Sequence, residues 1–577
     1  MPIHNSDVAE IFNQVADLLD IKGDNPFRIR AYRNAARAVN ALSQNISDMV
    51  SREKDLSQLQ GIGKDLAQKI IEIVNTGKLA LLDELEQDVP MELSDMMKIQ
   101  GLGPKRIKKL SQELGIQSME GLKDAAERGK ISDLSGFGKK TEHSIREELE
   151  RMEKQRKEGK ERVKLAVAAQ VAGPLIQYLK NVPGAKDLTV AGSYRRHKET
   201  VGDLDILATC RKKANIMDRF VRYEDVDNVL AKGKTKSSVI LRAGLQVDLR
   251  VVPQVSYGAA LLYFTGSKGH NIAIRKLAQK KNLKINEYGV FKGKKKIAGK
   301  SEGDVYRQIN LPLIEPELRE SRGEIEAAQE GNLPDLVTLD HIKGDLHTHT
   351  KETDGHHSLE EMAEAAGERG YEYLAITDHS RHVTVAKGLD EKRLSRQIDD
   401  IERFNDNQDD ILLLKSIELD ILEDGSLDLP DDILDRLDLV ICSVHSKFNL
   451  SQEKQTERII RAMDNSHFHI LCHPSGRLIN ERPPYEVNME KIIQAAKERE
   501  CFVELNAHPD RLDLNDIHCK MAKDIGVKVA VSTDAHRIDD LNWMAYGIGQ
   551  ARRGWLEPSD VLNTRSWKEL KKLIHRK

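Results

Sequence analysis

The most constraining feature of this chain is a series of seven strand-like apolar runs between residues 344 and 536. They alternate with helix-length segments, which predicts repeated strand–helix units and a parallel sheet. Six of the seven runs end in side chains that can bind a metal, and only CFVELNAHP departs, ending in Asn506. In a closed parallel barrel the carboxyl ends of all strands meet on one face, so these ligands would converge there. They are His347, His349, His379, Glu418, His445, His473, Asp534 and His536.

The composition is typical of a multidomain protein outside membranes. At 577 residues the chain is long enough for several domains. It has no apolar run of ~18 residues, and its start, MPIHNSDVAEIF, lacks a signal-peptide pattern. Its five cysteines form no CxxC pair, which argues against a disulfide framework or a cysteine-based zinc site. We expect a monomeric cytoplasmic protein.

The net charge of −3 conceals an uneven distribution. Residues 1–310 contain 55 Lys+Arg against 40 Asp+Glu, a net of +15, so the remaining residues carry −18. A basic first half predicts binding to a polyanion. The acidic second half would need metal cations to act on the same polyanion.

A glycine-containing pattern occurs three times in the basic half: LQGIGKDLAQKI (59–70), IQGLGPKRIKKL (99–110) and LSGFGKKTEHSI (134–145). Two glycines before a helix permit a tight turn whose backbone N–H groups can bind phosphate without reading bases. This is the helix-hairpin-helix pattern, although the third copy could be a simple packing turn. The residues expected at DNA are Gly61, Gly63, Gly101, Gly103 and Lys105.

A basic segment, PFRIRAYRNAARAV, precedes the first copy. It carries Arg28, Arg30, Arg33 and Arg37, with Tyr32 among them. The functional interpretation is a pocket for a DNA end, to which Arg28 and Tyr32 would contribute. The alternative is a solvated helix face.

The central region contains three carboxylates on predicted strands. Asp203 and Asp205 are two residues apart, so on a strand they face the same side. Asp248 follows in LQVDLRVVP, on another predicted strand. Three such carboxylates can hold two Mg²⁺ or Mn²⁺ ions about 4 Å apart, the arrangement for in-line phosphoryl transfer.

A Gly-Ser turn lies upstream of these carboxylates. Gly192 would let the backbone approach a triphosphate, and Ser193 and Arg196 could bind its terminal oxygens. Gly-Ser followed by Asp-x-Asp and a further Asp predicts a nucleotidyltransferase, whereas a simple charged β-hairpin would not explain the Gly-Ser turn.

The segment YFTGSKGHN (263–271), followed by a basic helix, makes the similarity specific. From its start to about residue 318 the chain resembles an X-family DNA polymerase. The resemblance implies an α+β palm and a thumb-type subdomain that closes on the nascent base pair, with the three aspartates as metal ligands. It implies nucleotide contacts by Tyr263, Phe264, Gly266, Asn271 and Arg275.

The resemblance also raises the question of lyase activity in the N-terminal domain. Some family members remove deoxyribose phosphate through a Schiff-base lysine, and Lys69 occupies the matching position. Asp65 stands where such lyases carry a second lysine, and Arg28 replaces another. We therefore favour binding of a 5′-phosphate over lyase chemistry.

The ligand-bearing region resembles the polymerase-and-histidinol-phosphatase (PHP) domain family, in the order His-x-His, TDGH, TDH, a strand-end Glu, two isolated His and DAH. The resemblance covers nearly all of residues 340–577 and implies a distorted (β/α)7 barrel. One metal could be held by His347, His349, Glu418 and Asp534, a second by Glu418, His445 and His473, and a third by Asp354, His379 and His536. Such mixed sets suit Mn²⁺, Zn²⁺ or Fe²⁺ and hydrolytic chemistry.

These predictions combine into a multidomain fold. The expected parts are a helical DNA-end-binding, lyase-like domain (1–88), a second helix-hairpin-helix domain (89–157), the palm (158–255), the thumb-type subdomain (256–317), a linker (318–339) and the PHP domain (340–577).

The predicted function is a DNA repair polymerase that fills short gaps with deoxynucleotides and carries a PHP 3′–5′ exonuclease. AP-endonuclease or 3′-end processing activity is compatible with the same site. One alternative is a polymerase with a catalytically silent PHP domain. Another is an RNA nucleotidyltransferase fused to a small-molecule phosphatase.

Overall fold

The computed structural model describes the chain except for residues 1, 2, 4, 41–45, 60, 91, 100, 101, 140, 147, 148, 150–161, 212, 213, 409 and 575–577. It divides into two compact units. The first comprises Met1–Arg162, Arg222–Val229 and Val239–Leu245, and the second comprises Val163–Val221, Leu230–Ser238 and Gln246–Lys577.

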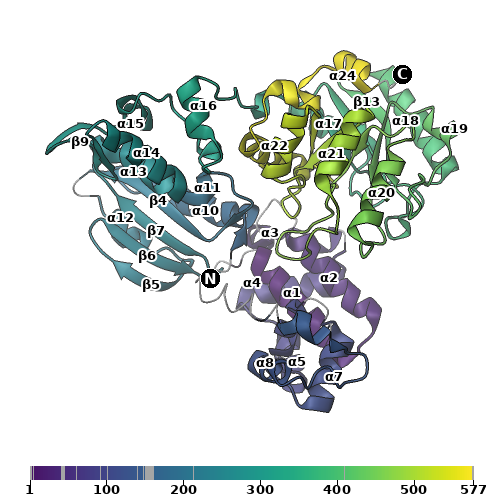
Figure 1. Cartoon of the computed structure of the whole chain (residues 1–577). Helices are drawn as coiled ribbons and strands as arrows, with labels where there is room; N and C mark the ends of the chain where they lie inside the picture. The colour runs from purple at the N-terminus through teal and green to yellow at the C-terminus, as the bar shows by residue number, and fades with distance from the viewer. Residues whose placement is uncertain are drawn as a thin grey trace. The chain divides into compact units, whose positions relative to one another are not determined.

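The N-terminal part of the first unit is helical (Figure 1). Apolar residues at helical spacing in α1, Val8, Phe12, Val15 and Leu19, are fully buried against neighbouring helices. The helices are α1 (Asn5–Lys22), α2 (Pro26–Asn40), α3 (Ile46–Ser51), α4 (Lys64–Thr76), α5 (Ala80–Asp88), α6 (Glu92–Asp95), α7 (Pro104–Leu114) and α8 (Met119–Glu127).

Two predicted hairpin turns precede α4 and α7. Gly63 and Gly103 are the N-cap residues of these helices, in extended conformation. Gly61 adopts a φ of +79°, a left-handed conformation that glycine accepts without strain. Helices of this kind begin with unpaired backbone N–H groups, as phosphate binding requires.

The palm follows the helical region along the chain, and most of its residues belong to the second unit. Its sheet has the strand order β2-β4-β7-β6-β5, in which β4 pairs antiparallel with β2 and parallel with β7. The elements are β1 (Val163–Lys164), α10 (Leu165–Lys180), β2 (Ala185–Val190), α11 (Gly192–Arg195), β3 (Thr200–Val201), β4 (Asp203–Cys210), α12 (Ile216–Phe220), β5 (Val226–Lys232), β6 (Lys236–Leu241) and β7 (Gln246–Val251).

The thumb-type subdomain follows, with a core that includes Ile274 and Val305. Ile325 and Leu336, from the segment expected to be a linker, pack into the same core. The elements are α13 (Tyr257–Thr265), α14 (Lys268–Lys280), β8 (Lys284–Asn286), β9 (Gly289–Lys292), β10 (Lys295–Ala298), α15 (Glu302–Gln308) and α16 (Glu324–Glu330).

The C-terminal domain is a seven-stranded parallel barrel in sequential strand order. A bridge between Thr348 and Ala535 joins the first strand to the end of the last. The strands are β11 (Gly344–Thr348), β12 (Tyr373–Ile376), β13 (Leu412–Asp420), β14 (Leu439–Ser443), β15 (Ile470–Leu471), β16 (Phe502–Asn506) and β17 (Val529–Ser532). The predicted (β/α)7 barrel is confirmed.

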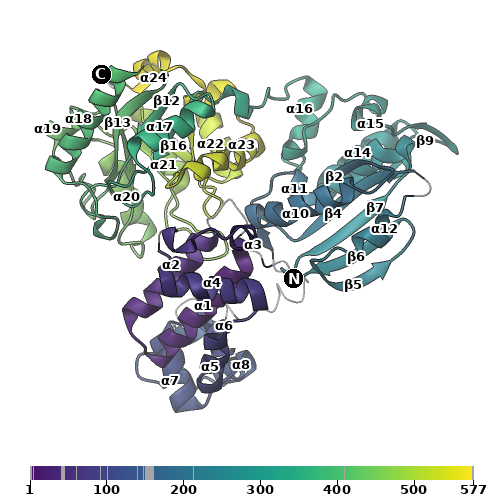
Figure 2. The ribbon, with the colours of Figure 1, turned by 180° about the vertical axis from the view of Figure 1, so that it is seen from behind.

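Helices surround this barrel (Figures 1 and 2). Strand residues alternate with period two: Leu374 and Ile376 join the cluster beneath the helices, whereas Tyr373 joins the interior cluster with Leu570 of α24. The helices are α17 (Leu359–Glu368), α18 (Glu391–Asn407), α19 (Asp431–Leu434), α20 (Gln452–Ala462), α21 (Met489–Glu498), α22 (Asp516–Ile525), α23 (Met544–Arg553) and α24 (Trp567–Ile574).

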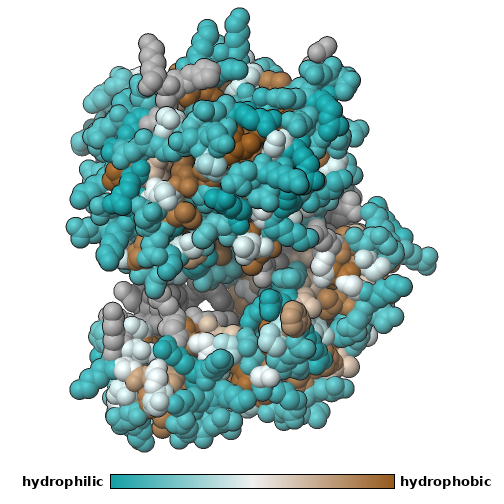
Figure 3. All heavy atoms as spheres, turned by 90° about the vertical axis from the view of Figure 1, so that its right-hand side faces the viewer, coloured by the Kyte–Doolittle hydropathy of each residue, from teal (hydrophilic) through white to brown (hydrophobic). Residues whose placement is uncertain are grey.

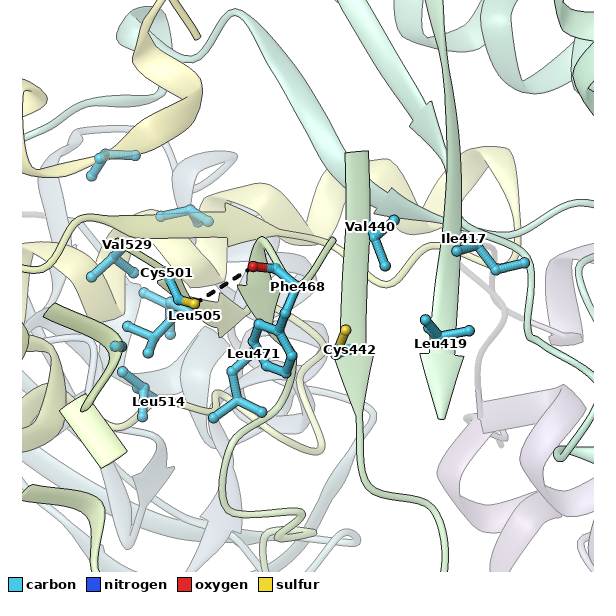
Figure 4. Packing of buried hydrophobic residues seen from close by; sticks show 14 of the residues in the cluster. Ile417, Leu419, Val440, Cys442, Phe468, Leu471, Cys501, Leu505, Leu514 and Val529 are labelled. Atoms are coloured by element: carbon cyan, nitrogen blue, oxygen red, sulfur yellow. Dashed lines mark hydrogen bonds between the residues drawn. The ribbon is translucent and has the colours of Figure 1, made fainter. Parts of the chain in front are cut away.

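Three cysteines of this barrel, Cys442, Cys501 and Cys519, belong to its hydrophobic packing, whereas Cys472 lies beside His347 and Glu504. Figure 4 shows Cys442 and Cys501 among Val440, Leu471 and Leu505, and the Cys501 thiol donates to the Phe468 carbonyl at 3.5 Å. Burial raises the pKa of the Cys442 thiol, which keeps it protonated. The five cysteines are free, as expected from the argument against a disulfide framework.

Figure 3 shows a largely hydrophilic face on which hydrophobic residues form small, scattered patches. Across the described residues, no helix combines the length and the apolar character needed to cross a membrane.

Candidate active sites

The palm brings its three predicted carboxylates onto two adjacent strands. In the parallel pairing of β4 with β7, Asp205 lies directly opposite Asp248, and Asp203 lies opposite Gln246. Along β4 the aspartates alternate with the buried Leu204. Asp203 and Asp205 therefore share one face of the strand, as their spacing predicts.

The Asp248 carboxylate is surrounded by donors. Lys236 Nζ lies 2.8 Å from Asp248 Oδ2, and Gln246 Nε2 donates to Asp248 Oδ1 at 3.1 Å. Burial raises the pKa of Asp248, but hydrogen bonds from Lys236, Ser238 and Gln246 outweigh it and leave the pKa below its usual value. Asp248 is thus an anion at neutral pH, the state that binds a divalent metal.

The predicted Gly-Ser turn lies against these carboxylates. Gly192 has a φ of +64°, and a Cβ atom at this position would lie 3.2 Å from Asp205 Oδ2. The Ala191 N–H donates to the Asp205 carbonyl at 2.7 Å, which ties the turn to β4. Ser193 lies in the same turn, within α11. A larger residue than glycine would therefore disturb the strand edge that carries Asp205.

Arg196 follows the turn and is held by groups that the sequence did not reveal. Its Nε donates to Glu320 Oε1 at 2.9 Å, and its Nη1 donates to the Thr265 carbonyl. Burial raises the pKa of Glu320, but Arg196 and Arg553 outweigh it and lower the pKa. The neighbouring Arg195 instead makes a bidentate pair with Glu302, at 3.0 and 2.7 Å.

The thumb-type residues cluster at the junction of α13 and α14. The rings of Tyr263 and Phe264 pack edge to face, with centroids 5.1 Å apart. Asn271 Nδ2 donates to the Tyr263 carbonyl at 2.7 Å, and Arg275 lies 5.6 Å from the Tyr263 ring centroid. A Cβ atom on Gly266 would lie 3.2 Å from Arg196 Nη1, so this turn contacts the palm arginine directly.

In the C-terminal domain, the Glu418 carboxylate lies at the centre of a histidine cluster. Its Oε1 is 2.9 Å from His473 Nε2 and 3.3 Å from His445 Nε2. Its Oε2 is 2.8 Å from His379 Nδ1 and 3.5 Å from His347 Nε2. Each carboxylate oxygen thus faces a different set of imidazoles, which is the geometry of a bridging ligand.

His349 joins two sides of the cluster. Its Nε2 lies 3.2 Å from Asp534 Oδ1 and 3.1 Å from His347 Nε2. Its Nδ1 lies 3.8 Å from Asp354 Oδ1, which is 3.5 Å from His536 Nε2. The ligand atoms of His349, Asp354, His379 and His536 lie within 4.8 Å of one another, so this group contains one histidine more than predicted.

The donor set of imidazoles and carboxylates fits divalent metal ions. Among the described groups, the buried His349 Nδ1 has no hydrogen-bond partner. Burial and the adjacent His536 and His379 lower the pKa of His349 to about 3, so its imidazole is neutral. Burial raises the pKa of Glu418, but the surrounding histidines outweigh it and lower the pKa strongly. Burial lowers the pKa of His379 and His536, but the neighbouring carboxylates outweigh it and raise the pKa to about 10 and about 9. Metal binds neutral imidazoles and ionised carboxylates, so its binding here would release protons.

Two further residues position these ligands and were missed by sequence reasoning. Glu504 Oε1 accepts from His347 Nδ1 at 2.7 Å, leaving Nε2 directed at the cluster. Asn506 Nδ2 donates to Asp534 Oδ2 at 3.0 Å. Asn506 therefore explains the strand end that departs from the pattern: it supports a ligand. The signal that could have identified Glu504 in the sequence is a charged residue at an inward-facing position of β16.

The first unit brings together three of the predicted DNA-end residues. Tyr32 is buried with its ring 5.6 Å from that of Phe12, and Lys69 is ion-paired with Asp65. Burial raises the pKa of Tyr32, and the positive charges of Lys69 and Arg28 partly offset this increase. Lys105 lies in the first turn of α7. Gly101 lies outside the described residues.

The regions of the chain match known families in the predicted order. The matches are a helix-hairpin-helix domain (3–79), a SAM-like helix-hairpin-helix tandem (93–151), the DNA polymerase beta palm (146–262), the DNA polymerase beta thumb (260–320) and the PHP domain (345–508).

Full-length similarity extends these matches. The chain is 39% identical over 579 residues to the DNA polymerase/3′-5′ exonuclease PolX of Bacillus subtilis (strain 168), covering 100% of both proteins. A probable phosphatase of Thermoanaerobacter sp. (strain X514) is 33% identical over 236 residues, 38% of this chain and 89% of that protein. A probable phosphatase of Caldanaerobacter subterraneus is 32% identical over 210 residues, 33% of this chain and 75% of that protein.

The chain belongs to the X family of DNA polymerases that carry a PHP domain. The predicted enzyme class, a DNA polymerase joined to a 3′–5′ exonuclease, is confirmed at the level of this family. Membership implies DNA and nucleotides as substrates and divalent metal ions as cofactors.

Proposed function

We propose that the palm fills short gaps in DNA during repair, with Asp203, Asp205 and Asp248 as the metal-binding carboxylates. The observation that carries this proposal is the pairing of Asp205 with Asp248 on adjacent parallel strands. When bound, Mg²⁺ or Mn²⁺ at these carboxylates would align the primer hydroxyl with the α-phosphate and offset the charge of the leaving pyrophosphate.

The surrounding residues would bind the other parts of the incoming nucleotide. The Gly192 turn brings its backbone beside the metal edge, where Ser193 and Arg196 bind the terminal phosphates. Tyr263, Phe264 and Gly266 contact the sugar. Asn271 and Arg275, on α14, approach the nascent base pair.

For the PHP domain we propose hydrolysis of the terminal phosphodiester at DNA 3′ ends. We propose the predicted ligands for these ions, with Glu418 shared between two sites. The geometry that supports this differs from the prediction in one respect: His349 faces Asp354 as well as Asp534. When bound, two to three Mn²⁺, Zn²⁺ or Fe²⁺ ions would lower the pKa of a water molecule and hold the phosphate. Glu504 keeps His347 in the tautomer whose Nε2 faces the cluster.

Two assays on the full chain test these proposals. Extension across a gapped duplex with a 5′-phosphate should proceed with deoxynucleotides and be much slower with ribonucleotides. A single-stranded, 5′-labelled oligonucleotide should be shortened from its 3′ end in Mn²⁺. Preference for ribonucleotides, or an oligonucleotide that stays intact with every metal, would contradict the respective proposal.

The similarity of the PHP domain to probable phosphatases supplies a second candidate, hydrolysis of phosphomonoesters. Release of inorganic phosphate from a 3′-phosphorylated end, without shortening of a 3′-hydroxyl strand, would favour it. AP-endonuclease activity would appear as cleavage at an abasic site.

For the first unit we propose that Arg28, Tyr32, Lys69 and the hairpin turns bind the 5′-phosphate side of a gap. The pairing of Lys69 with Asp65 favours phosphate binding over Schiff-base chemistry, which needs a neutral amine. Borohydride trapping on a 5′-deoxyribose-phosphate end tests this, because a covalent adduct at Lys69 would demonstrate lyase activity. We further propose the predicted domain boundaries, a monomer and a cytoplasmic location.

A further inference from the structure

The loop that carries the palm arginine Arg196 is held by residues of the PHP domain, within the second compact unit. Arg553, the last residue of α23, donates from Nη1 to the Arg196 carbonyl at 2.7 Å and to Glu320 Oε1 at 2.9 Å. Its Nη2 donates to Asp516 Oδ2 at 2.6 Å. One PHP side chain thus holds both the backbone of Arg196 and the carboxylate that orients the Arg196 guanidinium.

These contacts are buried. The side chain of Arg553 is 2% exposed, and those of Arg196 and Glu320 are 11% and 12% exposed. Asp516 is also paired with Arg322, at 2.9 Å. Buried ion pairs that share partners have one low-energy arrangement, so removal of one member disturbs the geometry of the others.

The helix backbone approaches the same loop closely. A Cβ atom on Gly549 of α23 would lie 2.4 Å from His197 Nδ1, so only glycine permits this packing. His197 is the residue after Arg196 and adopts a φ of +52°. The Arg553 side chain and the surface of α23 at Gly549 therefore both constrain the loop that carries Arg196.

Two of the three nitrogens of the Arg196 guanidinium are hydrogen-bonded to protein groups. Nε and Nη1 of Arg196 are occupied by Glu320 and Thr265, and no described protein group accepts from its Nη2. The Gly192 turn, with its Cβ position beside Asp205, and the Gly266 turn, with its Cβ position beside Arg196, lie next to this arginine. A guanidinium held beside the Gly266 turn that keeps one nitrogen for a ligand suits the terminal phosphates of a nucleoside triphosphate.

We propose that Arg553 is a positioning residue for the polymerase reaction: through Glu320 and the Arg196 carbonyl, the PHP domain sets the orientation in which Arg196 binds the incoming triphosphate. This inference rests on the proposed role of Arg196. It makes the PHP domain a structural part of the nucleotide site, in addition to its own hydrolytic centre.

The test is single-nucleotide incorporation on gapped DNA by the full-length chain. Arg553→Met should raise the KM for deoxynucleotide about three- to thirtyfold, the usual range for residues that act through a neighbour. The effect on kcat should be smaller, and DNA affinity and exonuclease rate should stay unchanged. The matched control is Arg552→Met, which removes the adjacent pair with Glu317, 2.8 Å long, without touching Arg196, and should leave KM within about twofold.

A double-mutant cycle separates positioning from general docking. In an Arg196→Ala background, Arg553→Met should add no further increase in KM. An unchanged KM in Arg553→Met, an equal increase in Arg552→Met, or the full increase in the Arg196→Ala background would overturn the inference. If Arg196→Ala alone leaves KM unchanged, the proposed role of Arg196 itself is wrong. Glu320→Gln, which keeps the side-chain volume, should reproduce the KM increase should Arg553→Met fail to fold.

Discussion

The two proposed catalytic centres of this chain contain different side chains in different surroundings. The palm offers three carboxylates on adjacent strands, with Lys236 offsetting the charge of Asp248. The PHP cluster surrounds the buried Glu418 with imidazoles and further carboxylates. Oxygen ligands suit Mg²⁺ that keeps water and substrate phosphates, whereas mixed nitrogen and oxygen ligands suit more tightly held transition metals. We therefore expect the palm to need its substrate to complete a metal site, and the PHP domain to hold metal without substrate.

The largest expected effect is a loss of primer extension with unchanged exonuclease activity, caused by a substitution in the palm. Asp205→Asn keeps the side-chain volume but removes a charge, and should slow primer extension on the order of a thousandfold. Exonuclease rate on a single-stranded 3′ end, measured on the same preparation, should stay within about twofold. Loss of both activities in a folded variant would break the comparison.

His347→Ala should have the converse effect. It removes an imidazole that faces both Glu418 and Asp534, so exonuclease activity should fall on the order of a thousandfold. Extension by the same preparation should be unaffected. Persistent exonuclease activity would show that this cluster is not the hydrolytic centre.

Glu504→Gln sharpens the comparison within the PHP domain. The carboxylate accepts from His347 but lies behind it, so its replacement should reduce metal affinity or exonuclease activity about ten- to a hundredfold. Added Mn²⁺ should restore part of the activity. Full activity at limiting Mn²⁺ would mean that the orientation of His347 does not depend on this carboxylate.

Gly192→Ala tests the close approach in the palm. The added Cβ would meet Asp205 Oδ2 at 3.2 Å in a backbone conformation with positive φ, so we expect a cost of about 1–2 kcal/mol and extension about tenfold slower. Gly173→Ala in α10, where a Cβ has no neighbour within 4 Å, is the matched control and should leave extension unchanged. Equal extension rates in the two variants would show that the close approach of Gly192 to Asp205 is not needed for extension.

The sequence predicted the proposed metal ligands better than the residues that position them. The position of His347 and Asp534 at strand ends predicted that these distant residues lie close together, because the carboxyl ends of parallel barrel strands lie on one face. Alternation along β4 placed Asp203 and Asp205 on one face. Both predictions depend on local periodicity, which the sequence displays directly.

Residues that act through tertiary packing could not be predicted in this way. Glu504 lies inside a strand-like run, and its role depends on the neighbouring strand that presents His347. Glu320 was expected in a linker, and its pairing with Arg196 and Arg553 appears only once the palm and the PHP domain are packed together. The ring of Tyr32 packs against Phe12 in the helical core, a contact that the arginine-rich sequence around it does not reveal.

Metal content measured by elemental analysis tests the central claim of two separate centres most directly. The full-length chain, loaded with Mn²⁺ and then desalted, should retain about two to three ions per chain, and Asp205→Asn should retain the same number. His347→Ala combined with His349→Ala should lose at least one of them while its thermal unfolding remains cooperative. Equal metal content in all three proteins, or a loss confined to Asp205→Asn, would contradict the account.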